Sequence, residues 1–254
     1  MIAKPVIIAA AVVTIFLLED IVPHYRGRTP RLRHAFPHVL TALLNGLLTR
    51  SILAGVTLQI TAWAAVHSFG LRYMLRFSPV AATVVLFVLF DIWMYFWHKA
   101  NHRIDFLWLF HRAHHSDTQM DTTTALRFHP GELILSTLVR MPVLVVLGMS
   151  FGQLLLFETI LNLSTLFHHS NLGLPRAWDR SLSVLIVTPD MHRVHHSIER
   201  EETNSNFTSL LSCWDRLFGT FKMRDDTRTI TLGLPEFRED RWQRFWGFFI
   251  TPAQ

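Results

Sequence analysis

The chain of 254 residues contains one cysteine, Cys213, so it can form neither an intrachain disulfide nor a cysteine-based zinc or iron–sulfur site. It also lacks the HExxH pattern of zinc hydrolases, because Arg112 stands where that pattern places its glutamate. No phosphate-binding glycine loop, nucleophile elbow or dinucleotide fingerprint occurs. These absences exclude several common enzyme classes and leave nitrogen and oxygen as the donors for any metal.

Apolar residues are abundant. They make up 50% of the chain, with 20 Phe and 8 Trp, and the mean hydropathy is +0.27. This exceeds what the core of a soluble domain needs, which predicts contact with lipid. The net charge of +5 arises from short basic runs beside apolar stretches, and the aromatic residues are not interleaved with them. We therefore expect a membrane, and not nucleic acid, as the partner of these charges.

Four apolar runs are candidates for membrane spans. The last run is too long for one crossing, and residues 148–152 offer a turn that divides it into a hairpin. The first run lacks a small-residue cleavage site, which favours a retained span over a signal peptide. The sequence thus predicts an all-α integral membrane protein with four to five transmembrane helices, in the runs 2–18, 39–66, 80–97 and 133–167.

The basic loop after the first run predicts the orientation. Its arginines are Arg26, Arg28, Arg31 and Arg33, and the positive-inside rule places them in the cytoplasm. Counting five crossings from there brings both the end of the 80–97 run and the end of the 133–167 run to the cytoplasmic side. The more polar stretch from residue 170 onward is expected to form a cytoplasmic helical cap. Within it, residues 245–250 are either an interfacial amphipathic helix or a tail packed on the cap.

Two of the runs carry a polar stripe on one helical face. Because ionisable groups are costly in lipid, such stripes normally face the interior of a helix bundle. Both stripes end in histidine at the predicted cytoplasmic side, which favours a site over simple helix pairing. The stripes are Asp91, Tyr95, His98 and His102 in one run, and Glu158, Asn162, Thr165 and His169 in the other.

Histidines occur in three clusters at helical spacing. Residues three and four apart share a helix face, so each cluster directs imidazoles to one place, as a metal site requires. A tetrahedral zinc needs three or four ligands, whereas the number here suits two metals of five or six coordination. The predicted ligands are His98, His102, His111, His114, His115, His169, His192, His195 and His196.

Other histidines stand apart from these clusters. His129 belongs to no pair, and the sequence leaves a ligand role and a structural role equally open for it. The remaining ones are expected to lie in loops or at the ends of spans without partners, so a solvated or capping role is predicted for His24, His34, His38 and His67.

The ordered clusters and the words around them resemble the fatty acid hydroxylase and sterol desaturase superfamily of membrane-bound non-haem di-iron oxygenases. The resemblance covers residues 80–220. It rests on the order HxxxH, HxxHH, HxxHH and on the segments LWxxH (107–111), TALRFHP (124–130), FxHSN (167–171), TPD (188–190) and WDRLFGT (214–220).

The resemblance implies a single domain over residues 1–254, with N-terminal spans (1–79), a catalytic core (80–220) and a C-terminal tail (221–254). It also implies an enzyme that binds two iron ions, takes dioxygen as co-substrate, and hydroxylates or desaturates a C–H bond of a fatty acyl or sterol-like lipid. Zinc is redox-silent and would serve only as an occupant of the site in isolated protein. Electrons would come from a separate donor protein.

The resemblance further implies roles for individual residues. The nine clustered histidines become metal ligands or their immediate partners, with His169 preferred over His168. Asp91 and Asp190 are expected to orient imidazoles through the second ring nitrogen. The alternative is a histidine-rich membrane protein that binds or transports metal without oxygenase activity; a transporter would spread its ligands through the depth of the bilayer.

Overall fold

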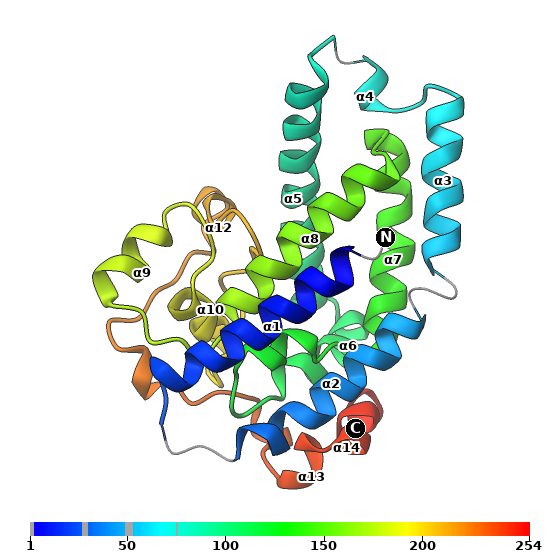
Figure 1. The fold of residues 1–254 in the computed structure, drawn as a ribbon. Coiled ribbons are helices and arrows are strands. Elements are labelled where there is room, and N and C mark those ends of the chain that lie inside the picture. The colour runs from blue at the N-terminus through cyan, green and yellow to red at the C-terminus, as the bar shows by residue number, and fades with distance from the viewer. Residues whose placement is uncertain (1–2, 27–29, 49–52, 75) are drawn as a thin grey trace.

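The structure is a computed structural model that describes residues 3–26, 30–48, 53–74 and 76–254. The described residues form helices and no strands, and three isolated bridges link loops. Arg28 of the basic loop and Arg50 lie outside the described residues. The longer helices (Figure 1) are α1 (Ala3–Ile21), α2 (Arg31–Leu48), α3 (Ala54–Val66), α5 (Pro79–Arg103), α6 (Asp105–His115), α7 (Pro130–Leu147) and α8 (Phe151–His168).

The shorter helices lie mostly in the C-terminal part of the chain. They are α4 (Leu71–Met74), η2 (Thr122–Leu126), α9 (Arg176–Leu182), α10 (Pro189–His195), α11 (Arg200–Thr203), α12 (Cys213–Leu217), η3 (Thr227–Thr229), η4 (Pro235–Phe237), α13 (Asp240–Gln243), α14 (Phe245–Ile250) and η5 (Thr251–Ala253).

Local sequence explains where the long helices begin and end. Ser78 caps α5 ahead of Pro79, and Ser150 with Gln153 forms a capping box at the start of α8. Between α7 and α8, Gly148 adopts the left-handed conformation that ends a helix (φ +66°). The predicted division of the 133–167 run into a hairpin is therefore confirmed.

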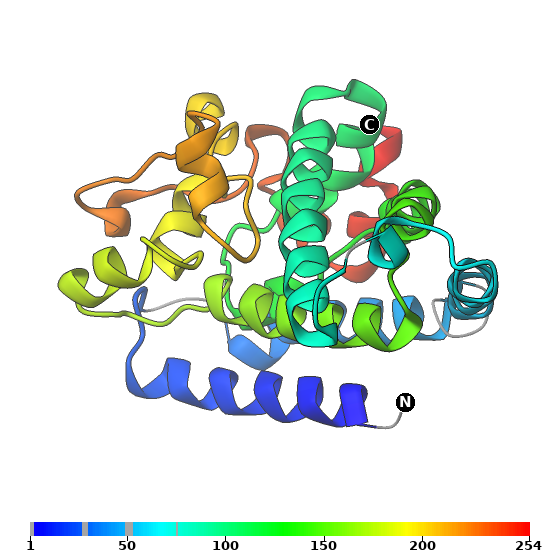
Figure 2. The same ribbon diagram turned by 90° about the horizontal axis from the view of Figure 1, so that it is seen from above.

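Helices α1 and α8 lie side by side and run in the same direction in both views (Figures 1 and 2). Near the start of α1, Lys4 pairs with Glu158 of α8, and near its end Glu19 accepts a hydrogen bond from the backbone N–H of Asn171. A second interface is apolar, where Leu86 and Phe90 of α5 share one core with buried residues of α7 and α8. These contacts join the long helices into one bundle.

Two of the described helices, α5 and α7, are long and apolar enough to cross a membrane. The expectation of one span over residues 39–66 is wrong, because this run is divided between α2 and α3. Near the C-terminus α14 packs on α2 with Phe248 buried, while Trp246 stays exposed.

The loop before α4 packs on the α7–α8 turn through two glycines. Gly70 has a φ of +106°, and a Cβ built on it would lie 2.4 Å from the backbone nitrogen of Gly148. We expect Gly70→Ala to lower the free energy of unfolding by more than about 1 kcal/mol, because the backbone strain of alanine at this positive φ adds to the steric overlap of its Cβ with Gly148. Gly46→Ala is the control: it lies inside α2, where an added Cβ would have no neighbour within 4 Å, so helix propensity should make it neutral or stabilising. Thermal unfolding of the two variants in detergent checks the opposite signs, and equal melting temperatures would contradict the argument.

Candidate metal centre

The clustered histidines come from four places in the chain: the end of α5, the C-terminal half of α6, the C-cap residue of α8, and α10 with the residue after it. Ile104 is the only residue between α5 and α6, and its extended backbone turns the chain. The turn brings α6 back against α5, so that His98 and His102 face His111 and His115.

The structure brings all nine predicted histidines together, in two adjacent groups. Within each group the potential ligand nitrogens lie within 4.8 Å of one another. The groups touch where the rings of His115 and His196 stack with their centroids 4.3 Å apart. The five-histidine group contains His98, His102, His111, His115 and His195; the four-histidine group contains His114, His169, His192 and His196.

Each HxxHH box contributes to both groups. In α6 the outer histidines, His111 and His115, belong to the five-histidine group, and the middle one, His114, belongs to the other. The α10 box does the reverse: its outer histidines join the four-histidine group and its middle one, His195, joins the five-histidine group. The spacing predicted that a box would direct its rings to one place, but the structure divides each box between two places.

Hydrogen bonds at the second ring nitrogen decide which nitrogen carries the proton. Nδ1 of His98 lies 2.7 Å from the carbonyl oxygen of Phe207, and Nδ1 of His195 lies 2.6 Å from that of Ser205. Since a carbonyl only accepts, both Nδ1 atoms must donate, and in the neutral rings each Nε2 carries a bare lone pair. Yet these two Nε2 atoms face each other at 3.1 Å.

The four-histidine group repeats this arrangement. Nδ1 of His169 donates to the carbonyl of Thr165 at 2.8 Å, and Nδ1 of His114 lies 3.3 Å from the carbonyl of Arg127. Their Nε2 atoms face each other at 3.0 Å. Lone pairs that meet at this distance without a proton repel each other, and a cation bound between them would turn the repulsion into coordination.

Burial strengthens this conclusion. The pKa values of His114, His192, His195 and His196 are held well below the usual histidine range, first by burial and then by neighbouring histidines, so these rings stay neutral. Both ring nitrogens of His115 and His196 are buried without a hydrogen-bond partner among the described residues. Such groups are costly unless something else binds them.

The separations of the nitrogen atoms also suit the coordination number. With metal–nitrogen bonds of about 2.1 Å, ligands at right angles lie about 3.0 Å apart, while tetrahedral ligands lie about 3.4 Å apart. The facing Nε2 pairs lie at 3.0 to 3.1 Å. The residues present therefore fit two metal ions, with a spacing suited to five or six ligands.

The acidic residues expected beside the histidines have other partners. Asp91 accepts hydrogen bonds from the backbone of Leu211 and from the indole of Trp214, so it joins α5 to the segment around α12. Asp190 accepts from Arg193 and from Thr227. Neither carboxylate has a hydrogen bond to a clustered imidazole in the described part of the chain.

Glu132 was not predicted from the sequence as part of the centre, although it lies beside one of the predicted ligands. Its carboxylate lies 2.7 Å from Nδ1 of His111, and the side chain is buried. The signal was available: Glu132 is an acid in the first turn of an apolar helix, directly after Pro130 and Gly131. Backbone carbonyls, which no sequence pattern identifies, hold four of the other eight rings, those of His98, His114, His169 and His195.

Two further histidines lie near the groups without joining them. His129 caps α7: its Nδ1 accepts from the backbone N–H of Gly131, and its Nε2 lies 3.3 Å from the carbonyl of Phe249. His168 is buried, and its ring lies 4.1 Å from that of His192, but it belongs to neither group.

His34 and His38 were expected to be solvated or to cap helices, and this is wrong. His34 is buried between Asp121 and Asp117, each 2.9 Å from one ring nitrogen. His38 lies between Thr123 and Arg127. Their spacing could suit a metal, but every ring nitrogen already has a partner and a guanidinium lies beside them. We interpret this cluster as a packing network behind the metal centre.

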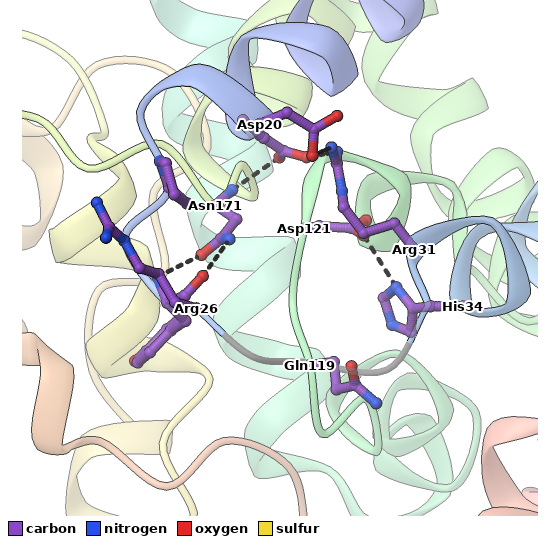
Figure 3. A pocket seen from close by; sticks show the side chains of 10 residues that line it. Asp20, Arg26, Arg31, His34, Gln119, Asp121 and Asn171 are labelled. Carbon is purple, nitrogen blue, oxygen red and sulfur yellow. Dashed lines mark hydrogen bonds and ion pairs between the residues drawn. The ribbon is translucent and has the colours of Figure 1, made fainter.

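A polar cavity of about 280 Å³ lies on the outer side of this network. Figure 3 shows Arg31 directed toward the end of α1, where it pairs with Glu19 and Asp20, and His34 directed toward Asp121. Asn171, two residues after His169, forms another part of the wall. The cavity is lined by His34 and Asp121 of the network and by none of the nine clustered histidines.

The comparisons with known proteins agree with this centre. Residues 83–220 match the model of the family described as fatty acid hydroxylase. The match covers more than half of the chain and contains all nine clustered histidines, so the chain belongs to the fatty acid hydroxylase family.

Named relatives extend beyond the matched segment. The chain is 26% identical to alkylglycerol monooxygenase of Homo sapiens, over 93% of this chain and 55% of that protein. It is 28% identical to ornithine lipid hydroxylase OlsE of Rhizobium tropici, over 85% of this chain and 66% of that protein. A third relative, the very-long-chain aldehyde decarbonylase GL1-9 of rice (Oryza sativa), is 28% identical over 73% of this chain and 70% of that protein. The chain thus spans about half of the length of the human relative. No solved structure matches the chain.

The two groups predict a metal stoichiometry. Wild-type protein should retain two ions per chain after dialysis against a weak chelator, and His114→Ala should reduce this toward one, because it removes a ligand from the four-histidine group only. His67→Ala is the control, since this exposed ring hydrogen-bonds the carbonyl of Trp63 and belongs to neither histidine group. Elemental analysis per chain checks the numbers. One ion in the wild type, or two tightly held ions in His114→Ala, would contradict the assignment.

Glu132→Gln tests the carboxylate behind His111. The substitution keeps the shape but removes the charge that makes the imidazole a better ligand, so we expect metal affinity to fall about 10- to 100-fold. Release of metal to a chromogenic chelator gives the measurement, with the exposed Glu236→Gln as control. Unchanged release from Glu132→Gln would show that the carboxylate has no influence on the centre.

The buried network predicts a dependence of stability on pH. Burial opposes the charged form of His34, but Asp117 and Asp121 outweigh it and raise the pKa of His34 to about 10. A raised histidine pKa contributes stability that is complete below about 6.5 and is lost as the pH rises through about 10. His34→Gln should therefore be less stable than wild type at pH 6.5, and the difference should shrink toward pH 10. The flanking groups His38 and Arg127 are present in both proteins, so their titration affects both alike. Denaturant unfolding at several pH values measures the difference in the free energy of unfolding between the two proteins. A difference that stays constant with pH would exclude a charged His34.

Proposed function

We propose that the protein is a membrane-bound non-haem di-iron oxygenase that uses dioxygen and electrons from a separate donor protein to hydroxylate or desaturate a C–H bond of a lipid. The observation that carries the proposal is the pair of adjacent groups of neutral imidazoles, whose Nε2 lone pairs meet at 3.0 to 3.1 Å. Family membership supports it, as do relatives named as an alkylglycerol monooxygenase and an ornithine lipid hydroxylase.

Iron ions held by the two groups would supply the oxidising power that breaks an unactivated C–H bond, which redox-silent zinc cannot supply. The chain's own residues would hold and shield them. Glu132 orients His111, and backbone carbonyls orient His98, His114, His169 and His195. Phe128 stacks on the ring of His114 at 4.5 Å, and the fully buried Phe207 packs against His98 and His102. These apolar rings keep water from one side of the centre.

We further propose that the bundle spans the membrane with the histidine groups at its cytoplasmic end. The end of α5 and the start of α7, the two helices able to cross, both contribute to the centre, through His98 and Glu132. The four or five crossings expected from the sequence would need further helices beside these two, and α3, with 13 residues, is too short to be one of them. A metal transporter would need ligands along the depth of the bilayer, whereas here both groups lie at one end of α5.

The test is mass spectrometry of lipids from cells that express the protein, compared with cells that express His114→Ala or no protein. A gain of one oxygen atom in a lipid, dependent on the intact site, supports hydroxylation; a loss of two hydrogen atoms supports desaturation. Iron and zinc are measured in the same preparations. Two irons per chain without any change in lipids would contradict the oxygenase, and zinc with no change would support the metal-binding alternative.

A further inference from the structure

Large apolar side chains are exposed on α9, on the segment after it and on α12, outside the long helices of the bundle. Trp178 and Leu182 lie four residues apart, so they share one face of α9. Leu185, after α9, is 70% exposed and Leu217, at the end of α12, is 67% exposed. An exposed apolar surface of this kind marks a site of interaction. We call it the α9–α12 face, and it consists of Trp178, Leu182, Leu185, Leu217 and Phe218.

Hydrogen bonds join the two parts of the face. The backbone N–H of Ser212, directly before α12, donates to the carbonyl of Leu185 at 3.2 Å, and its hydroxyl donates to the carbonyl of Ser183 at 2.6 Å. An isolated bridge pairs Ile186 with Leu211 beside them. Both views place α9 and α12 on the same side of the molecule, opposite α3 (Figures 1 and 2). The exposed side chains therefore belong to one connected surface.

The α9–α12 face continues onto α5, one of the two helices able to cross a membrane. The ring of Phe218 packs against Tyr95 and Phe96 of α5, with centroids 5.1 and 4.9 Å away. Phe96 itself remains half exposed. It lies about 26 Å along α5 from Pro79, near the far end of a hydrocarbon core of about 30 Å. Phe218 and its neighbours thus lie at the level where α5 leaves the bilayer, on the side of the histidine groups.

Cations border the apolar residues of α9. Arg176 and Arg180 lie four residues apart on another side of this helix, and both pair with the single carboxylate of Asp225. Two guanidinium groups that share one carboxylate leave a net charge of +1. A helix with an apolar aromatic face and arginines beside it is typical of segments that lie in the interface between lipid headgroups and acyl chains.

From these contacts we infer that the α9–α12 face rests on the cytoplasmic leaflet of the membrane, with its apolar side chains at the boundary between headgroups and acyl chains. A bilayer around α5 already contacts Phe96, so it reaches Phe218 without any further partner. A protein bound at this face would have to displace lipid from the side of α5. The inference rests on the membrane placement proposed above and does not depend on the metal chemistry.

The only cysteine of the chain provides the probe. Cys213 is exposed on α12, four residues before Leu217, so a label attached to it reports on the α9–α12 face. The full-length protein is labelled with a nitrobenzoxadiazole fluorophore and placed in nanodiscs of phosphatidylcholine and phosphatidylglycerol. We expect the emission to shift to shorter wavelength than in water, and to lose intensity when the phosphatidylcholine is brominated near the headgroup end of its acyl chains.

Matched labels at other positions calibrate this result, each in the Cys213→Ser background. Phe96→Cys reports on the span, and Leu185→Cys reports on the other end of the face. Glu239→Cys is the polar control, at the start of α13, which lies at the opposite end of the molecule from α4 (Figure 1). Brominated lipid should quench Cys213 and Leu185→Cys nearly as strongly as Phe96→Cys, and should leave Glu239→Cys unchanged. Because the first label uses the native cysteine, the test does not depend on the folding of any variant.

Two results would overturn the inference. If brominated lipid quenches Phe96→Cys but affects Cys213 no more than Glu239→Cys, the face does not touch the bilayer, while the proposed placement of α5 stands. If the shift at Cys213 occurs without quenching and disappears on dilution of the labelled protein, a second copy of the chain covers the face instead. Absence of quenching at Phe96→Cys as well would contradict the membrane placement together with the inference.

Discussion

The repulsion between facing imidazole lone pairs is the constraint around which the rest of the structure is arranged. Backbone carbonyls and Glu132 place the protons on Nδ1, so that Nε2 atoms meet at 3.0 to 3.1 Å with no proton between them. Three elements bring these Nε2 atoms together: the single-residue turn at Ile104, the end of α8 and the short helix α10. A cation bound at each meeting point would turn the cost of burying these rings into a source of stability.

The division of each HxxHH box between the two groups couples the two sites mechanically. α6 supplies His111 and His115 to one group and His114 to the other, and α10 does the reverse. A movement of either helix would therefore change both histidine groups together.

Most of the helical framework was predictable because its signals are local. Ser78 and Pro79 begin α5, Gly148 ends α7, and the apolar runs give the lengths of the helices. The prediction of one helix over residues 39–66 failed because hydropathy alone does not register where an apolar run changes direction. His34 and His38 were misjudged for another reason: their partners Asp117, Asp121 and Thr123 lie more than eighty residues away in the sequence.

The sequence by itself determined that most of the nine histidines occur in sets three or four residues apart, which the periodicity of a helix places on a common face. Only the tertiary structure decided how they divide into five and four, that Glu132 lies behind His111 while Asp91 and Asp190 bind elsewhere, and that Lys4, Arg140 and Glu158 share one place. These outcomes depend on how separate helices pack against one another. Residue spacing along one helix carries no information about that packing.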